Sequence, residues 1–171
     1  MLKRWLKNER GLTLIELLAV IVILGIIAAI AIPAIGGLID NSKKDAHVAN
    51  AQQMINAAKI AVTSDKSLLP PKGQSLYINL KYLEDNGYLE TVKDPDGLEY
   101  KNLEANTPTP AASASLTEPS NDSYVVIINN NNKLTYKVKL VNSSRGVQTG
   151  GTGEAAGKAV AEDQLSRQNV R

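Results

Sequence analysis

An uninterrupted run of 23 uncharged residues, from Leu17 to Ile39, constrains this chain more than any other feature. As an α-helix the run would be roughly 35 Å long, which is enough to cross a bilayer core of about 30 Å. The residues from Asp40 onward are much more polar. The sequence therefore predicts a membrane-inserted helix that carries a modest polar domain, and it fits a soluble enzyme poorly.

Residues 1–11 form a short basic leader. They hold four basic residues and one acidic residue: Lys3, Arg4, Lys7 and Arg10 against Glu9. Because basic flanks stay on the cytoplasmic side of a membrane, we expect the leader there and the carboxyl end outside. Hydrophobicity alone leaves two interpretations open: a membrane anchor, or a secretory signal cleaved near the A-x-A pattern that ends at Ala31.

The chain has no Cys and one His. These absences exclude disulfides, thiolate metal sites, thiol nucleophiles and metal sites built on two histidines. The sequence also has no Gly-rich phosphate loop before a helix and no nucleophile elbow. We therefore expect no enzymatic activity, no catalytic residue, no metal and no cofactor.

Glu16 is an acidic residue at the mouth of the apolar segment, five residues after Gly11. An acid in such a position is costly and is expected to have a function and a positive partner. If the chain is cut after Gly11, Leu12 carries a free α-ammonium about one helical turn from Glu16. The two charges would pair within one chain or between adjacent chains, and the second arrangement would fix their axial register.

The string Gly11-Leu12-Thr13-Leu14-Ile15-Glu16-Leu17-Leu18 follows a basic leader and precedes a long apolar helix. In this it resembles the processing site of type IV pilins and pseudopilins. The resemblance implies that a prepilin peptidase cuts between Gly11 and Leu12 and that the new amino group of Leu12 is methylated. It also implies that Glu16 pairs with the amino terminus of a neighbouring subunit and that Pro33 kinks the helix. The missing cysteines depart from many Gram-negative pilins and fit Gram-positive relatives or pseudopilins better.

By this resemblance the protein is expected to be a structural subunit of a type IV pilus that serves adhesion, twitching motility or DNA uptake. Its implied partners are further copies in a helical filament, the prepilin peptidase, an inner-membrane assembly platform, an assembly ATPase, the membrane before assembly and, more weakly, DNA. It would be a single-pass membrane protein with a cytoplasmic leader before processing, and part of a cell-surface pilus afterwards. The alternatives are a major pseudopilin of a type II secretion or competence machine and a secreted binding protein cleaved near Ala31.

After Ile39 the pattern becomes amphipathic. Apolar residues recur at helical spacing on one face, namely Val48, Ala51, Ile55, Ala58 and Val62, with Met54 and Ala61 beside them. One long helix is therefore predicted from near Leu12 to near Ser64. Residues 12–39 are its transmembrane and filament-core half, and residues 40–66 are its amphipathic half.

Residues 67–142 are predicted to form a small head, so that the fold class is α+β: a pilin-like long kinked helix packed on a small antiparallel sheet. The expected elements are a helix at Ser75–Asn86, a turn at Asp94–Gly97, strands at Tyr124–Ile128 and Leu134–Val141 joined by a loop at Asn129–Asn132, and a third strand at Leu98–Leu103. The Thr-, Pro- and Ser-rich residues 106–123 are expected to be a surface loop. Residues 143–171 are expected to be a largely disordered tail.

Three further groups of residues were considered as sites. Asp94, Asp96 and Glu99 suggest calcium, but their spacing lacks the fuller ligand pattern of a dedicated loop and favours a turn. His47 is expected to be solvated on the polar side of the helix. The basic residues Lys133, Lys137, Lys139 and Arg145 suggest either contact with DNA phosphates or the ordinary protection of an edge strand, which we favour.

Overall fold

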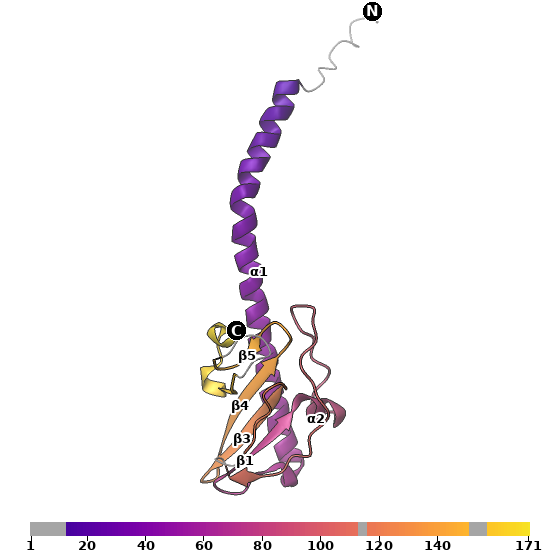
Figure 1. The fold of residues 1–171 in the computed structure, drawn as a ribbon, viewed down its shortest axis with the longest axis vertical. Coiled ribbons are helices and arrows are strands. Elements are labelled where there is room, and N and C mark those ends of the chain that lie inside the picture. Colours follow the sequence, from indigo (N-terminus) through magenta and orange to yellow (C-terminus); the bar gives the residue numbers. More distant parts are fainter. Residues whose placement is uncertain (1–12, 113–115, 151–156) are drawn as a thin grey trace, which may run out of the picture. The chain divides into compact units, whose positions relative to one another are not determined.

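The computed structural model describes residues 13–112, 116–150 and 157–171 (Figure 1). The basic leader, Gly11 and Leu12 lie outside the described residues. The chain divides at Asp40 into two compact units, which we describe separately. The first unit, as far as it is described, consists of the beginning of helix α1 (Leu14–Ser64).

The second unit begins with the remainder of α1, which is followed by the short helix η1 (Lys66–Leu68). Its strands are β1 (Gln74–Asn79), β2 (Ala111–Ala112), β3 (Tyr124–Asn130), β4 (Lys133–Val141), β5 (Gly146–Val147) and β6 (Val160–Ala161). The short helices are α2 (Leu80–Asp85), η2 (Glu162–Gln164) and η3 (Arg167–Asn169). All pairs are antiparallel in the order β2-β1-β3-β4-β5, with β6 also paired to β4. The predicted α+β class is confirmed.

The main core of the head lies between one face of the sheet and α1, as Figure 1 shows. Alternate residues of β1 and β3 point inward, and they are buried against the predicted apolar face of the helix. This cluster includes Ala51, Met54, Ile55, Ala58, Ala61, Leu76, Ile78, Val125, Ile127, Val138 and Leu140, each 0% exposed. The helical spacing read from the sequence therefore marked the buried face correctly.

The predicted helix at Ser75–Asn86 is wrong in its first half, which forms β1 instead. Leu76 and Ile78 alternate with residues that face the other way, and the strand pairs with β3 along its length. The helix begins only at Leu80, where the side chain of Asn79 accepts a hydrogen bond from Tyr82 N at 3.0 Å. The predicted glycine stop is correct, because Gly87 has φ of +73° directly after the helix cap.

The predicted β3–β4 hairpin is confirmed, and its turn is reduced to Asn131 and Asn132, which both have positive φ. The expected third strand at Leu98–Leu103 is a single bridge, which joins Tyr100 to Asn142. Residues 106–112 and 116–123 form a loop, as expected, apart from the two residues of β2.

The expectation of a disordered tail over residues 143–171 does not hold for its described parts, 143–150 and 157–171. Strands β5 and β6 pair with β4, and backbone hydrogen bonds join Gly146 to Arg171 in both directions. Val147, Val160 and Val170 are buried in the main core. Average composition pointed to disorder because these few apolar residues are spread among many small polar ones.

Candidate functional site

The start of α1 is organised by Glu16 and Thr13. Thr13 N and Thr13 Oγ1 donate hydrogen bonds to Glu16 Oε2 at 2.7 and 2.9 Å, and Glu16 N donates to Thr13 Oγ1 at 3.3 Å. This reciprocal pattern is a capping box, which satisfies amide groups at the helix start. From the sequence, Glu16 was paired with the amino group of Leu12 and the role of Thr13 was missed, although the T-x-x-E spacing signals this cap. The predicted pairing with Leu12 and the cut after Gly11 involve residues outside the described ones, so both remain predictions.

The segment after Glu16 presents apolar side chains over its whole circumference. Ile30, Ile32 and Leu38 are 72%, 69% and 67% exposed within the described chain. The helix contains an 18-residue window of mean hydropathy 3.0, none of which is buried. A helix this long and apolar can cross a membrane or pack against other apolar helices. Length and composition carry this conclusion.

Pro33 lies inside α1, which continues on both sides of it. Proline cannot donate the backbone hydrogen bond of an ordinary helical residue, and its ring crowds the preceding turn. A Cβ added to the nearby Gly36 or Gly37 would meet no atom within 4 Å, so local packing does not require glycine at either position. The predicted kink at Pro33 remains a prediction.

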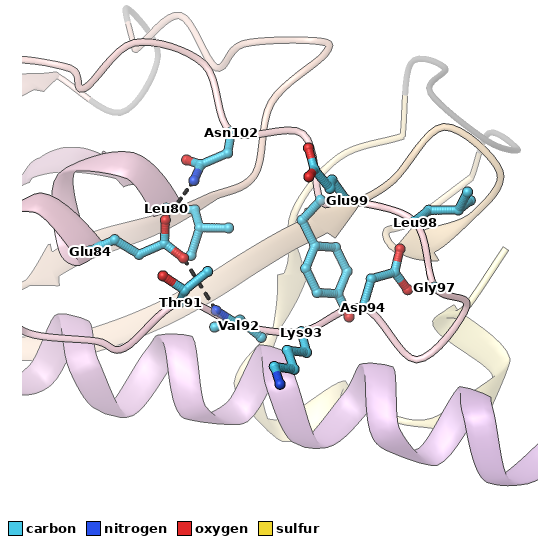
Figure 2. Close-up of a pocket in the computed structure, with 11 residues that line it drawn as sticks. Leu80, Glu84, Thr91, Val92, Lys93, Asp94, Gly97, Leu98, Glu99 and Asn102 are labelled. Carbon is cyan, nitrogen blue, oxygen red and sulfur yellow. Dashed lines mark hydrogen bonds between the residues drawn. The ribbon is translucent and has the colours of Figure 1, made fainter.

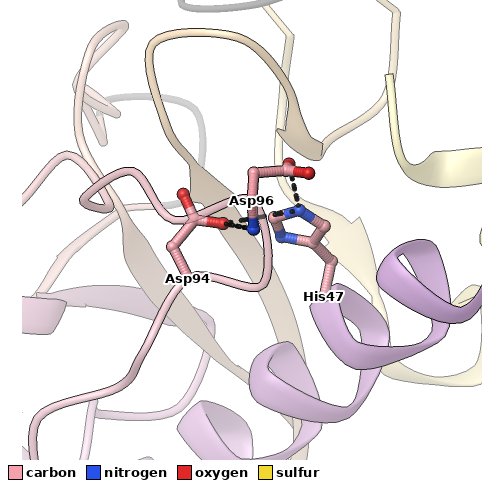
Figure 3. Close-up of side chains that lie close together, drawn as sticks. All are labelled: His47, Asp94 and Asp96. Carbon is pink, nitrogen blue, oxygen red and sulfur yellow. Dashed lines mark hydrogen bonds and ion pairs between the residues drawn. The ribbon is translucent and has the colours of Figure 1, made fainter. Parts of the chain in front are cut away.

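In the head, His47 corrects the expectation of a solvated histidine, because its side chain is 0% exposed (Figure 3). Its Nε2 lies 2.9 Å from Asp96 Oδ2, and its Nδ1 lies 2.8 Å from the hydroxyl oxygen of Tyr100. Asn50 Nδ2 also donates to that hydroxyl, at 3.0 Å. These four side chains form a chain of hydrogen bonds between α1 and the 94–100 segment. Burial raises the pKa of Tyr100, which keeps the phenol protonated.

The predicted turn at residues 94–97 is confirmed. Gly97 N donates to Asp94 O at 3.1 Å, and Asp96 N donates to Asp94 Oδ1 at 2.9 Å. Gly97 has φ of +75°, which glycine adopts without strain. The turn brings both carboxylates to His47, which sequence spacing alone had not connected with them (Figure 3).

A guanidinium completes this cluster. Arg145 Nε and Nη2 donate to Asp96 Oδ2 and Oδ1 at 2.7 and 2.6 Å. Lys43 Nζ lies 3.4 Å from Asp96 Oδ1, and Asn142 Nδ2 donates to Asp94 Oδ2 at 2.6 Å. Hydrogen bonding from Arg145 holds the pKa of Asp96 well below its ordinary value, and His47 adds to this effect.

The geometry of the same cluster was tested against a metal ion. The possible ligand atoms of His47, Asp94 and Asp96 lie within 4.8 Å of one another. However, the Arg145 fork occupies both oxygens of Asp96, and its positive charge would repel a cation. Glu99, the third residue considered for calcium, is not part of this group. The donor set therefore fits a charge-balanced link between α1, the turn and residue 145 better than a metal site.

The basic residues considered for DNA do not form one surface. Lys139 is 0% exposed and its Nζ donates to Ser120 O, while Arg145 is held by Asp96. Lys133 and Lys137 are exposed. The edge-protection interpretation does not hold for Lys137 and Lys139, because β4 pairs with β3 on one side and, from Lys137 onward, with β6 and β5 on the other. The interior position of the strand was not visible because β5 and β6 were not predicted.

A pocket of about 510 Å³ lies between α2 and the 91–102 segment, and we call it the α2 pocket (Figure 2). Glu84 of α2 organises its wall: Oε1 accepts from Val92 N at 3.3 Å, and Oε2 accepts from Asn102 Nδ2 at 2.6 Å. The lining carries three carboxylates and one lysine: Glu84, Asp94, Glu99 and Lys93. The pocket is therefore rich in acceptors and negative in net charge. The pocket was not predicted from the sequence.

Comparison with known proteins gave one family match. A family model for the prokaryotic N-terminal methylation motif matches residues 6–32, which include Gly11, Leu12, Glu16 and the first part of the apolar segment. No curated protein and no solved structure matches the chain. The motif covers the amino-terminal segment and leaves the head unmatched. The amino-terminal segment is therefore similar to the prokaryotic N-terminal methylation motif, and in this chain a long helix and a small antiparallel sheet follow it.

Proposed function

We propose that the protein is a structural subunit of a type IV pilus. A prepilin peptidase cuts it after Gly11, Leu12 becomes the methylated first residue, and the processed chain polymerises through the apolar part of α1. The methylation motif supports processing by a peptidase of this kind and a general dependence on membrane assembly machinery. The pilus itself, the assembly platform and the assembly ATPase belong to the proposal.

The observation that carries the proposal is the exposed apolar surface between Leu17 and Ile39, with Glu16 as the acidic residue at its start. Before assembly a bilayer covers such a surface, and after assembly the equivalent segments of neighbouring copies cover it. Inside a bundle of these helices, a carboxylate needs a positive partner. The amino group of Leu12 on an adjacent copy supplies that charge.

The capping box suggests how the carboxylate of Glu16 is stabilised before assembly. Thr13 already gives Glu16 two hydrogen bonds, which lowers the cost of placing the acid near the membrane. Assembly then exchanges or supplements these bonds with a charge pair. Glu16 is a positioning residue in this proposal, and no catalytic residue is involved.

The mature amino terminus is the first test. The protein is taken from its native membrane and from the fraction sheared off the cell surface, and the terminal peptide is identified by mass spectrometry. A peptide that begins with N-methyl-Leu12 is the expected result. A start at Ile32 would show cleavage after Ala31, as in an ordinary secreted protein, and would overturn the proposal.

A major pseudopilin of a secretion or competence machine is the second candidate. The run from Leu83 to Leu89, followed by Asp94-Pro95, resembles the loop of Gram-positive pilins and major pseudopilins. Both candidates share the same processed terminus, so electron microscopy of the sheared fraction distinguishes them. Long surface fibres labelled by an antibody against the head support a pilus. Short rods confined to the envelope support a pseudopilus.

A further inference from the structure

One end of the head carries three exposed lysines, Lys66, Lys72 and Lys133, which we call the basic tip. They lie where α1 gives way to β1 and where β3 turns into β4. None of the three forms an ion pair within the described residues. The neighbouring carboxylate of Asp65 is occupied locally, since Oδ1 accepts a hydrogen bond from Ser67 N at 2.8 Å.

The basic tip is held in shape by hydrogen bonds between its two parts. Asn129 Nδ2 donates to Pro70 O at 2.8 Å, and Gly73 N donates to Asn129 O at 2.9 Å. Asn132 N donates to Asn129 Oδ1 at 2.8 Å, which closes the β3–β4 turn. The lysines are therefore presented on a narrow, pre-organised end of the sheet, which lowers the entropy lost on binding.

The α2 pocket lies at the opposite end of the same sheet. Strand β1 runs from the basic tip to Asn79, and α2 follows directly. Strand β4 starts at Lys133 in the tip and ends at Val141, whose carbonyl accepts a hydrogen bond from Lys101 N at 2.7 Å. At about 3.3 Å per residue, the strand separates the two ends by roughly 25–30 Å.

The two ends are complementary in charge. The pocket lining has three carboxylates against one lysine, and the tip has three lysines against one carboxylate. Two of the pocket carboxylates, Glu84 and Asp94, accept hydrogen bonds within the head, and Glu99 is the exposed one. At the pocket rim, the exposed carboxylate of Glu99 has no ion pair within the part of the chain that the structure describes. Opposite charges on opposite ends favour a head-to-tail contact, which repeats without closing.

A second observation concerns Asn102 in the pocket wall. Its Nδ2 is fixed by the carboxylate of Glu84, which only accepts hydrogen bonds, so Oδ1 must point the other way. That oxygen is buried and has no hydrogen-bond partner among the described residues. A buried acceptor without a partner is costly, so this part of the pocket wall is incompletely hydrogen-bonded.

We propose that the basic tip of one copy docks in the α2 pocket of the next copy. The inference rests on the proposed polymerisation and adds to it a contact between heads, separate from the packing of the apolar helices. The ammonium groups of Lys72 and Lys133 face the carboxylate of Glu99 across this contact. The partner is a second copy of this chain.

Zero-length carbodiimide coupling tests the contact directly, because it forms an amide bond only between an ammonium and a carboxylate that touch. Native membranes and sheared fibres carrying the full-length protein are coupled, digested and analysed by mass spectrometry. A link from Lys72 or Lys133 to Glu99 must join two copies, since the two ends of one head lie roughly 25–30 Å apart. Mixing isotope-labelled and unlabelled protein verifies this.

Charge reversal supplies a second test. Glu99→Lys, and separately the pair Lys72→Glu with Lys133→Glu, are expected to lower the ratio of fibre to membrane protein about threefold or more. Combining both reversals is expected to restore at least half of the original ratio. Lys137→Glu is the matched control, because this exposed lysine lies in the middle of β4 and away from the tip. It is expected to leave the ratio unchanged.

The outcomes separate this inference from the proposed function. One outcome rejects the docking contact and keeps the proposed pilus function. In it, fibres form with a methylated Leu12, no coupled peptide is found, and Glu99→Lys lowers the fibre ratio no more than Lys137→Glu does. If the wild-type chain forms no fibres, the proposed pilus function is rejected. The docking contact is then supported if the coupled peptide is found in membranes, and it is rejected if the peptide is absent. The docking contact is also rejected if Glu99→Lys and the lysine pair each lower the fibre ratio but their combination does not restore it.

Discussion

The partly buried fork between Arg145 and Asp96 offers a quantitative test of the head structure. We consider Arg145→Met, which keeps much of the aliphatic stem and removes the guanidinium. The side chains of Arg145 and Asp96 are 18% and 12% exposed, so water screens their interaction weakly. Breaking a buried pair by removing one partner costs about 3–5 kcal/mol. In Arg145→Met, Lys43 and His47 remain beside the carboxylate of Asp96. We therefore expect the free energy of unfolding to fall by about 2–3 kcal/mol.

The assay is thermal unfolding of the full chain in detergent, followed by near-ultraviolet circular dichroism of the tyrosines in the head. For a unit of this size the loss corresponds to a fall in Tm of roughly 6–12 °C. Arg167→Met is the matched control. Arg167 makes the same kind of fork with Asp45, but their side chains are 55% and 50% exposed, so we expect little change in Tm. Equal shifts in the two variants would refute the reasoning.

The same pair predicts a dependence on pH. The folded-state pKa of Asp96 is lowered, chiefly by hydrogen bonds from Arg145. A lowered pKa contributes stability that is fully present above the unfolded-state pKa of about 3.9 and is lost as the pH falls below it. The difference in Tm between wild type and Arg145→Met should therefore be constant between pH 5 and 7 and should shrink below about pH 4. A difference that grows on acidification contradicts this account.

Three further predictions concern processing, assembly and the core. Gly11→Ser should leave the full-length chain in the membrane, visible as a larger band than the processed protein; normal processing would contradict the assigned cut. Glu16→Ala should be processed normally but should enter fibres poorly, as measured by the ratio of sheared to membrane protein, and an unchanged ratio would refute the charge pairing. Met54→Ala removes a side chain that is 0% exposed and should lower the free energy of unfolding by about 2–4 kcal/mol, measured by urea titration; a loss below about 1 kcal/mol would contradict its place in the core.

Patterns that repeat along the chain predicted the fold well. The spacing of Ala51, Ile55 and Ala58 marked the face of α1 that the sheet covers, and the Asn-rich turn marked the β3–β4 hairpin. Strand β1 was missed because the helix that begins at Leu80 was extended back to Ser75, whereas pairing with β3 determines the conformation of the residues before Leu80. Residues 143–171 were predicted to be disordered from their average composition. That average does not reveal the few apolar residues that pack in the core or pair with β4.

Some of the candidate site residues could be predicted from the sequence, and others could not. Glu16 was recognisable from sequence because an acid inside an apolar run is anomalous wherever the chain folds. His47 was not, because its burial depends on Asp96, Tyr100 and Arg145, which lie on other elements. The α2 pocket was equally hidden, since its walls are brought together by the tertiary fold. Long-range polar contacts of this kind leave no periodic signal in the sequence.

The contacts between α1 and residues 162–167 bear on the order in which the head folds. Arg167 bonds Asp45 across 122 residues of sequence, and Glu162 bonds Lys59 across 103. Strand β4 likewise pairs with β6, whose residues follow their partners by more than twenty positions in the sequence. Contacts of such long sequence separation form slowly, because chain entropy is lost before they are made. In the proposed pilus subunit, the head would therefore reach its native state only once these late contacts have formed, and a subunit that lacks them would not yet present a folded head for assembly.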